Sequence, residues 1–265
     1  KLKIRLPDSV PPMVSSSFES LIPVIITLVL VCSINYCFTL TSFGNIHALV
    51  NEIIQKPLLL IGTGLPALLI SQGLAQLLWF FGLHGDQIVG SVMDPILQTA
   101  GMENLSAYTA GDAVPYIITD QFRALFVMIA FMSLVIAILI VSKSNRLKGV
   151  GKVAVLPATF CISEPVVFGA PVVMNAMLFI PWVLSRPVFG LITWLFMKFG
   201  LCPYPTGVAI PWTTPPVLSG FLATNSIMGA VVQIICLAIG VLMFIPFVKM
   251  IDKTYHQEEI KTKEQ

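Results

Sequence analysis

One carboxylate in an otherwise apolar stretch is the strongest candidate for chemistry in this sequence. Glu164 lies in the run CISEPVVFGAP, residues 161–171, which Pro165 and Pro171 interrupt. A carboxylate at membrane depth is costly unless it is hydrated, paired or protonated. Pro165 prevents a regular helix from continuing, so Glu164 lies beside backbone groups that a polar ligand can use. We expect Glu164 to accept a hydrogen bond from a hydroxyl such as that of a sugar. The alternative is a side chain that satisfies the backbone of its own loop or reaches the membrane interface.

His84 is the second candidate, in the run WFFGLHGDQ, residues 79–87. Gly82 and Gly85 flank it and allow a ligand or another segment to approach the backbone closely. Asp86 could orient or charge the imidazole ring. We include His84, Gly85 and Asp86 among the substrate-binding candidates, although a lone histidine at the end of a span is often simply interfacial.

Aromatic and amide side chains complete the candidate set. Trp79 lies near His84, and Trp212 lies in the proline-rich run PWTTPP, residues 211–216, with Thr213 beside it. Pyranose rings have apolar C–H faces that pack on such aromatic surfaces, but tryptophan is also common in interfacial belts. Asn175 is a polar residue within an apolar run, where it could cap a segment or bind a ligand.

The composition indicates that most of this chain is surrounded by lipid. Of 265 residues, 56% are hydrophobic and 11% are charged, and the mean hydropathy is +0.90. Soluble domains carry roughly a quarter charged residues. The net charge of +2 is too small to suggest a nucleic-acid partner. We therefore expect an all-α integral membrane protein.

Metal, cofactor and soluble-enzyme motifs are not apparent in the sequence. The five cysteines form no C-x-x-C pair, and no histidine stands at metal-ligand spacing from one of them. The sequence contains no Walker loop, G-x-S-x-G motif, zinc signature or dinucleotide fingerprint. We expect no metal and no cofactor, and we expect the cysteines to be small buried hydrophobes.

Long uncharged runs predict the membrane spans, since a helix needs about 20 apolar residues to cross the bilayer core. We place spans at about 18–43, 57–85, 124–142 and 217–248. A fifth apolar run lies before Lys198, but Arg186 interrupts it and leaves only about eleven uncharged residues between these two charges. Arg186 could lie at a turn and reach the interface, or it could lie in a kinked span and face an aqueous cavity.

Three shorter segments are expected to differ from these spans. Residues 44–56 have apolar side chains at helical spacing and read as an amphipathic helix in the interface. Residues 153–170 read as a re-entrant hairpin, because helix-breaking residues at membrane depth survive only inside protein or beside water. Residues 84–111 could form a second hairpin. The charged tail, 252–265, is expected to be frayed.

Basic residues near the span ends predict the orientation. One cluster lies between the third span and the hairpin, and another lies in the tail: Lys143, Arg146, Lys148 and Lys152, then Lys249, Lys253, Lys261 and Lys263. We place both clusters, and the C-terminus, in the cytoplasm. The basic residues before position 6 would then lie outside.

Four motifs resemble one family of membrane proteins. The blocks are ISEPVVFGAPVVMNAMLFIP at 162–181, PWTTPPVLSGFLAT at 211–224, WFFGLHG at 79–85 and VPPMVSSSFESLIP at 10–23. They resemble the enzyme IIC permease subunits of the lactose/cellobiose/chitobiose phosphotransferase family. The sequence departs from the family pattern at Cys161, where Gly or Asn is expected, at Asp86-Gln87, where Asn is usual, and at Arg186.

The resemblance implies a fold and an activity. The chain would be the C-terminal transport part of a larger permease, with about five spanning helices, an interfacial helix and two re-entrant hairpins. The full-length protein would be a homodimer in the cytoplasmic membrane of a bacterium. A disaccharide of the cellobiose, lactose or chitobiose type would be carried inward and phosphorylated by a IIB partner, itself supplied by IIA.

The resemblance also implies roles for individual residues. Glu164 corresponds to the key glutamate, which would bind and help activate the sugar hydroxyl, and His84 corresponds to the key histidine. Trp79 and Trp212 would pack on the sugar. Two alternatives remain open from the residues: a proton-coupled sugar symporter that uses Glu164, and a degenerate fragment that does not transport. Activity of this chain as an enzyme would require the IIB partner.

Overall fold

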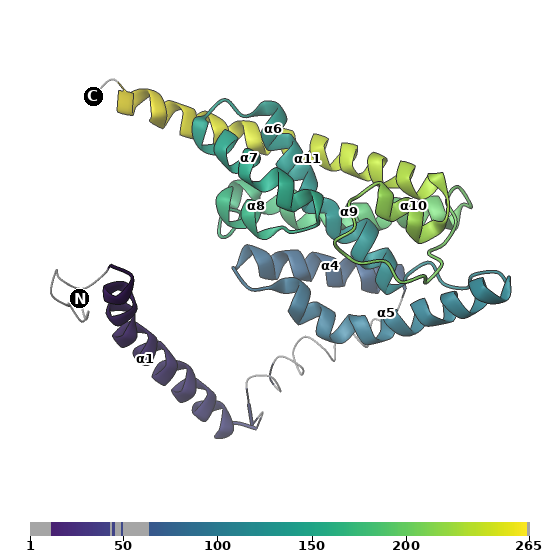
Figure 1. Cartoon of the computed structure of the whole chain (residues 1–265), viewed down its shortest axis with the longest axis horizontal. Coiled ribbons are helices and arrows are strands. Elements are labelled where there is room, and N and C mark those ends of the chain that lie inside the picture. Colours follow the sequence, from purple (N-terminus) through teal and green to yellow (C-terminus); the bar gives the residue numbers. More distant parts are fainter. Residues whose placement is uncertain (1–11, 43, 46–48, 50–63, 264–265) are drawn as a thin grey trace. The chain divides into compact units, whose positions relative to one another are not determined.

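The computed structural model describes residues 12–42, 44–45, 49 and 64–263. They fall into two compact units, residues 1–57 and 58–265, which are treated separately. The predicted interfacial helix at 44–56 lies almost entirely outside the described residues. Figure 1 shows the helices of both units.

In the first unit the structure describes the helix α1, Pro12–Thr39. Its segment Leu21–Thr39 has a mean hydropathy of 2.3. Serine and threonine within it return their hydroxyls to the helix backbone, as when Ser33 Oγ donates to the carbonyl of Val29. The helix is therefore a candidate membrane span, close to the position that the uncharged run predicts.

The second unit is a bundle of helices around two adjoining hydrophobic cores. Its helices are α4 (Leu65–Phe80), α5 (Gly85–Ala110), a π-helical turn η2 (Phe122–Val127), a 3-10 turn η3 (Met128–Ala130), α6 (Phe131–Val141), α7 (Asn145–Thr159), α8 (Glu164–Gly169), α9 (Ala176–Lys198), α10 (Leu218–Thr224) and α11 (Ile227–Lys263).

Four helical segments among the described residues are long and apolar enough to cross a bilayer. They are Leu21–Thr39, Phe122–Val141, Ala176–Lys198 and Ile227–Lys261. Residues 57–63 of the predicted span at 57–85 lie outside the described residues, and the remainder contains the 16-residue helix α4. The chain is thus an all-helical membrane protein in its described parts, with α4 as a shorter fifth apolar helix.

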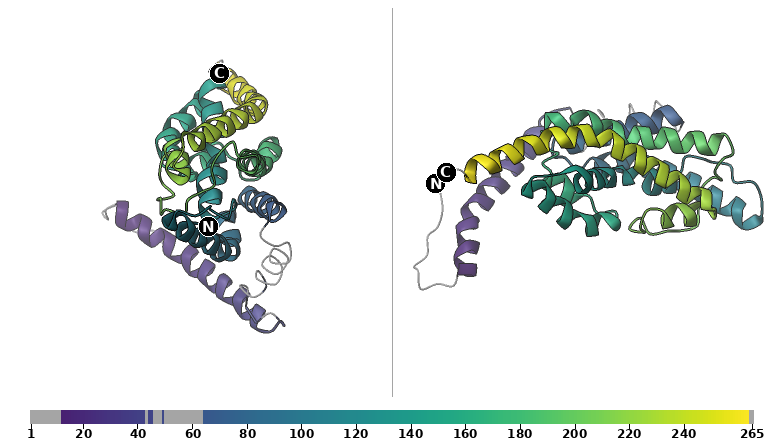
Figure 2. Two further views of the ribbon diagram at one scale, coloured as in Figure 1. Left: turned by 90° about the vertical axis from the view of Figure 1, so that its right-hand side faces the viewer. Right: turned by 90° about the horizontal axis from the view of Figure 1, so that it is seen from above.

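Helices α9 and α11 run antiparallel at the centre of the second unit. The hydroxyl of Thr193 lies 3.6 Å from the thiol of Cys236, whereas Leu178 and Trp182 share a core with Phe244 further along α11. Figures 1 and 2 show α11 running along most of the length of this unit. This pairing defines two ends of the unit, one near Lys198 and one near the last turns of α11.

The segment 84–111, expected as a possible hairpin, is the single helix α5. Val89, Met93 and Leu97 are buried on one face at a spacing of four residues. Pro95 is tolerated on the exposed side of the helix. The chain instead reverses before this segment, since α4 and α5 are joined by only the four residues 81–84.

The second predicted hairpin, 153–170, corresponds to α7, a break and the short helix α8. The break occupies residues 160–163, and Cys161 there has a φ of 63°. The first arm begins earlier than expected, at Asn145, where Ser144 caps it by accepting a hydrogen bond from the amide of Leu147 at 3.3 Å.

The charged tail is not frayed: it continues α11 as a helix to Lys263. Asp252 is buried at the start of this segment and binds the N-terminus of α7. Its carboxylate accepts hydrogen bonds from the amides of Lys143 at 2.7 Å and Ser144 at 3.0 Å. The two basic clusters, in the loop before α7 and at the end of α11, therefore lie at the same end of the unit.

Candidate functional site

The turn between α4 and α5 brings Trp79 and His84 together. Their ring centroids lie 4.4 Å apart, with the ring planes tilted by 47°. Trp79 is the second-last residue of α4 and is 3% exposed, whereas His84 is exposed at the start of α5. Gly82, with a φ of 80°, allows the chain to reverse within four residues. The two residues, which are near in the sequence, are therefore also neighbours in space.

His84 also caps α5. Its Nδ1 accepts a hydrogen bond from the amide of Gln87 at 3.3 Å. An acceptor nitrogen carries no proton, so this cap assigns the imidazole proton to Nε2. The exposed ring thus keeps a hydrogen-bond donor for a ligand.

Asp86 acts on Trp79 rather than on the histidine ring. Its Oδ2 accepts a hydrogen bond from the indole Nε1 of Trp79 at 2.9 Å. Arg186 forms an ion pair with the same carboxylate, donating from Nη1 to Oδ1 and from Nη2 to Oδ2 at 3.0 Å. Among the described residues, the hydrogen-bond partners of this carboxylate are thus Trp79 and Arg186.

The position of Arg186 is resolved in favour of a span. It lies in the middle of the continuous helix α9 and its side chain is 2% exposed. It does not lie at a turn, and its guanidinium pairs with the carboxylate of Asp86. Sequence reasoning did not find this pair, although two opposite charges in apolar segments are a signal for one.

Glu164 is exposed as the first residue of α8. It forms no hydrogen bond or ion pair with the residues that the structure describes. It therefore does not satisfy the backbone of its own hairpin, which was one of the two alternatives to ligand binding. Its carboxylate is available to a ligand or to solvent.

Two contacts link the hairpin that carries Glu164 to other candidate segments. After α8, the amide of Met174 donates to the carbonyl of Phe80 at 2.9 Å, at the end of α4. At the break, the thiol of Cys161 donates to the carbonyl of Thr214 at 3.7 Å. The turn of His84, the hairpin of Glu164 and the loop of Trp212 are therefore neighbours in space.

The remaining candidates differ in how free their side chains are. Trp212 is 57% exposed and Thr213 is partly buried, both in the loop before α10. Asn175 is the cap of α9, its Oδ1 accepting from the amide of Met177 at 3.0 Å. Gly85 has a packing role, because a Cβ there would overlap the backbone of Ala75 in α4.

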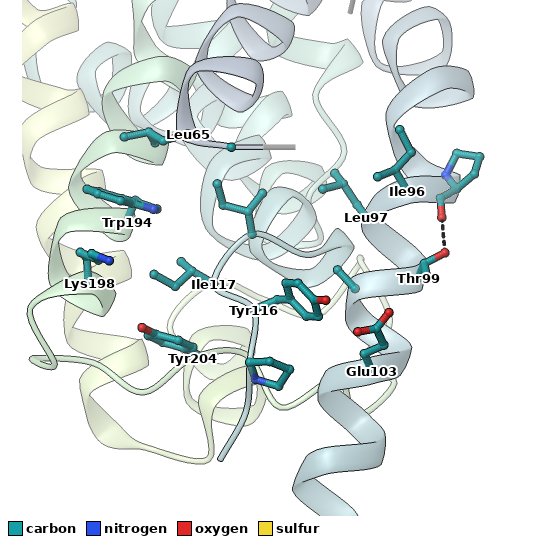
Figure 3. A pocket seen from close by; sticks show the side chains of 15 residues that line it. Leu65, Ile96, Leu97, Thr99, Glu103, Tyr116, Ile117, Trp194, Lys198 and Tyr204 are labelled. Atoms are coloured by element: carbon teal, nitrogen blue, oxygen red, sulfur yellow. Dashed lines mark hydrogen bonds between the residues drawn. The ribbon is translucent and has the colours of Figure 1, made fainter. Parts of the chain in front are cut away.

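A cavity of about 760 Å³ lies away from these residues, toward the Lys198 end of α9. Figure 3 shows Trp194, Tyr116 and Tyr204 around it, with Lys198 and Glu103 at its sides. It shares no lining residue with the candidate site. Since α9 and α11 are antiparallel, it lies toward the end opposite the basic clusters.

Buried amides between α4 and α9 were also missed by sequence reasoning. Gln76 donates from Nε2 to the carbonyl of Trp182 at 3.0 Å and to the hydroxyl of Ser185 at 3.3 Å. The indole of Trp182 returns a bond to the carbonyl of Gln76 at 3.1 Å. These bonds fix the helix that carries Arg186 against the helix that carries Trp79.

Comparison with known families agrees with the resemblance seen in the motifs. The family model described as "Phosphotransferase system, EIIC" matches residues 1–185. The chain belongs to this EIIC family. The match includes the turn of His84, the hairpin of Glu164 and Asn175.

Individual EIIC proteins align with nearly the whole chain. The oligo-beta-mannoside-specific EIIC component of Bacillus subtilis (strain 168) is 45% identical over 257 residues, which are 95% of this chain and 58% of that protein. The cellobiose-specific EIIC component of Geobacillus stearothermophilus is 38% identical, over 97% of this chain and 58% of that protein.

A solved structure supports the fold. The crystal structure of ChbC, the IIC component from the N,N'-diacetylchitobiose-specific phosphotransferase system, superposes with a TM-score of 0.74 at 37% identity. The alignment covers 97% of this chain and 61% of ChbC. The chain therefore spans a little over half the length of the relatives it matches.

Proposed function

We propose that this chain is the sugar-binding and transport part of an EIIC permease that carries a disaccharide inward for phosphorylation. The observation that carries the proposal is the convergence of three segments, each with one freely available group. These are the imidazole Nε2 of His84, the carboxylate of Glu164 and the indole face of Trp212. The contacts from Met174 to Phe80 and from Cys161 to Thr214 support this convergence.

These groups match the chemistry of a sugar. A carboxylate accepts hydrogen bonds from hydroxyls, a neutral imidazole donates one from Nε2, and large aromatic faces pack on the apolar side of a pyranose ring. Glu164 binds the hydroxyl that receives the phosphoryl group and His84 binds a second hydroxyl. Trp212 packs on the sugar, and Trp79, which is 3% exposed, supports the ring of His84 from behind. Thr213 and Asn175 line the site.

The chemical step needs a partner. The sugar oxygen attacks phosphorus on the phosphorylated cysteine of IIB, an O–P bond forms, the S–P bond breaks, and Glu164 accepts the hydroxyl proton. The product is charged, which disfavours its return through an apolar path. IIA supplies IIB indirectly, and the full-length permease is a homodimer.

The orientation follows from the positive charges. The contact between Lys143 and Asp252 brings both basic clusters to one end, and such clusters favour the cytoplasm. The C-terminus is then cytoplasmic, and IIB docks at that end. The cavity at Lys198 lies toward the outer end.

The names of the relatives narrow the substrate to test. These relatives are named for oligo-beta-mannosides, lichenan, cellobiose and N,N'-diacetylchitobiose. A panel of radiolabelled cellobiose, mannobiose, lactose and diacetylchitobiose is therefore appropriate. Binding to the purified chain in detergent is measured by equilibrium dialysis.

Glu164→Gln and His84→Ala test the site within this panel. Each removes one hydrogen-bonding group and is expected to weaken binding of the preferred disaccharide by about tenfold or more. Unchanged affinity in both variants would refute the site, and binding of no disaccharide would favour a fragment that does not transport. Uptake that follows a proton gradient without sugar phosphorylation would favour the symporter.

A further inference from the structure

We propose that Arg186 and Asp86 are positioning residues that fix the Trp79 ring and, through it, the ring of His84 that binds the sugar. The inference rests on the proposed function and adds to it. These two residues are departures from the family pattern, so their role is not carried over from the family resemblance.

The carboxylate of Asp86 is shared between two partners. Oδ2 accepts from Trp79 Nε1 at 2.9 Å and from Arg186 Nη2 at 3.0 Å, while Oδ1 accepts from Arg186 Nη1. The guanidinium and the carboxylate thus meet through two parallel hydrogen bonds, which fix both side chains in angle as well as distance. The acceptor of the indole is therefore held from α9, one hundred positions along the chain.

Burial makes this arrangement stiff. The side chains of Arg186 and Asp86 are 2% and 11% exposed. Separating a buried pair leaves an uncompensated charge in the low-dielectric interior, which is strongly unfavourable. The pair therefore moves as a unit with α4, α5 and α9, and Gln76 ties α4 to α9 next to it.

The indole has few remaining ways to turn. Its Nε1 is bound to Asp86 and its ring lies 4.4 Å from the ring of His84. Rotation about either side-chain torsion would break the hydrogen bond and leave a buried N–H without a partner. Because Trp79 is 3% exposed and lies against the exposed ring of His84, Asp86 thus determines the surface on which that ring rests, and Arg186 determines where Asp86 lies.

A charge exchange separates positioning from simple stabilisation. The double variant D86R/R186D restores an ion pair between α5 and α9, but arginine at position 86 has no acceptor for the indole. We expect it to recover most of the thermal stability that the single variant R186D loses. We expect its disaccharide affinity to remain about tenfold below that of the original chain.

R186K is the conservative control. Lysine keeps the charge beside Asp86, although it gives up the paired geometry. Asp86 keeps its bond to Trp79, so affinity should stay within about threefold of the original, a small free-energy change. Recovery of both stability and affinity in the exchanged pair would overturn the proposal.

A second measurement covers the case in which the exchanged pair does not fold. D86E keeps the charge but shifts the acceptor by one methylene, and W79F removes the indole N–H while leaving an aromatic ring. If Asp86 acts through Trp79, D86E lowers disaccharide affinity in the original chain and has no further effect in W79F. An equal effect of D86E in both backgrounds would overturn the proposal.

The outcome is distinguishable from failure of the proposed function. That function fails if Glu164→Gln and His84→Ala leave disaccharide binding unchanged. Positioning fails alone if those two variants lose binding while D86E acts equally with and without the indole.

Discussion

Replacing Asp252 with alanine should destabilise the base of the α7–α8 hairpin. Asp252 is 4% exposed and accepts bonds from the amides of Lys143 and Ser144 and, at 2.6 Å, from the hydroxyl of Ser144. The hydroxyl can turn to another acceptor, but the two amides at the start of α7 cannot. D252A therefore removes the acceptor of two backbone donors, and the bond to the amide of Ser144 is buried.

The magnitude follows from these two donors. A hydrogen bond to a charged group contributes about 1.5–3 kcal/mol, so their loss costs about 3–6 kcal/mol. For 150–250 residues, each kcal/mol lowers Tm by about 2–4 °C. The lower bound of 3 kcal/mol corresponds to a fall of roughly 6–12 °C. D252N keeps one carbonyl oxygen as acceptor and should lose less than half as much.

The assay is thermal unfolding of the purified chain in detergent, followed by circular dichroism at the helix band. Asp112 provides a matched control, because it is exposed in the loop after α5 and D112A should change stability by no more than about 0.5 kcal/mol. Equal Tm values for D252A and D112A would show that the contact between α11 and α7 contributes nothing to stability.

Three further predictions use the same assay. Gly85→Val should unfold the chain at a clearly lower temperature, because its side chain would overlap the backbone of Ala75, whereas Gly149→Ala, in open space on a helix, should be neutral or stabilise by about 0.5–1 kcal/mol; equal shifts would contradict the packing argument. Asn175→Ala should cost about 1 kcal/mol by removing the cap of α9, and Asn175→Ser, which can cap, should restore most of it. Gln233→Leu should cost about 3 kcal/mol or more, because it removes three hydrogen bonds to residues 217–220 at the start of α10 and one to the carbonyl of Leu125 in η2; a stability equal to that of the original chain would refute this.

Local sequence signals predicted much of the fold. Uncharged runs located α1, the span that begins at Phe122, and α11, because the need to bury backbone polar groups in lipid leaves helices as the solution. Pro165 likewise located the break beside Glu164. The hairpin predicted at 84–111 shows the limit of this reasoning. Polar residues in this segment suggested a break, although the buried residues of α5 keep a helical spacing.

The helical end of α11 could have been found from the sequence. Val248, Ile251 and Tyr255 follow one another at spacings of three and four residues and pack in the core near α7. A charged segment with one apolar stripe of this kind is an amphipathic helix rather than a frayed tail.

The ion pair of Asp86 with Arg186 could not be located by local reasoning. The two residues are one hundred positions apart, and their meeting depends on how α9 docks against α4. Sequence alone left two interpretations of Arg186, since an isolated charge does not reveal its partner. The candidate site was predictable as a set of residues, but not the division between those that are free to bind and those that hold other side chains.

The bend at Cys161 stores energy next to the proposed sugar hydroxyl site. Its φ of 63° is costly for a residue with a β-carbon, by about 1–2 kcal/mol, and glycine adopts it freely. The contact with Thr214 helps to hold this conformation, so the bend should relax when the loop of Trp212 withdraws. The conformation of the hairpin at Cys161 then depends on the position of that loop. Cys161→Gly would remove this backbone strain, because glycine adopts the same φ without cost. The position of Glu164 would then depend less on the position of the loop.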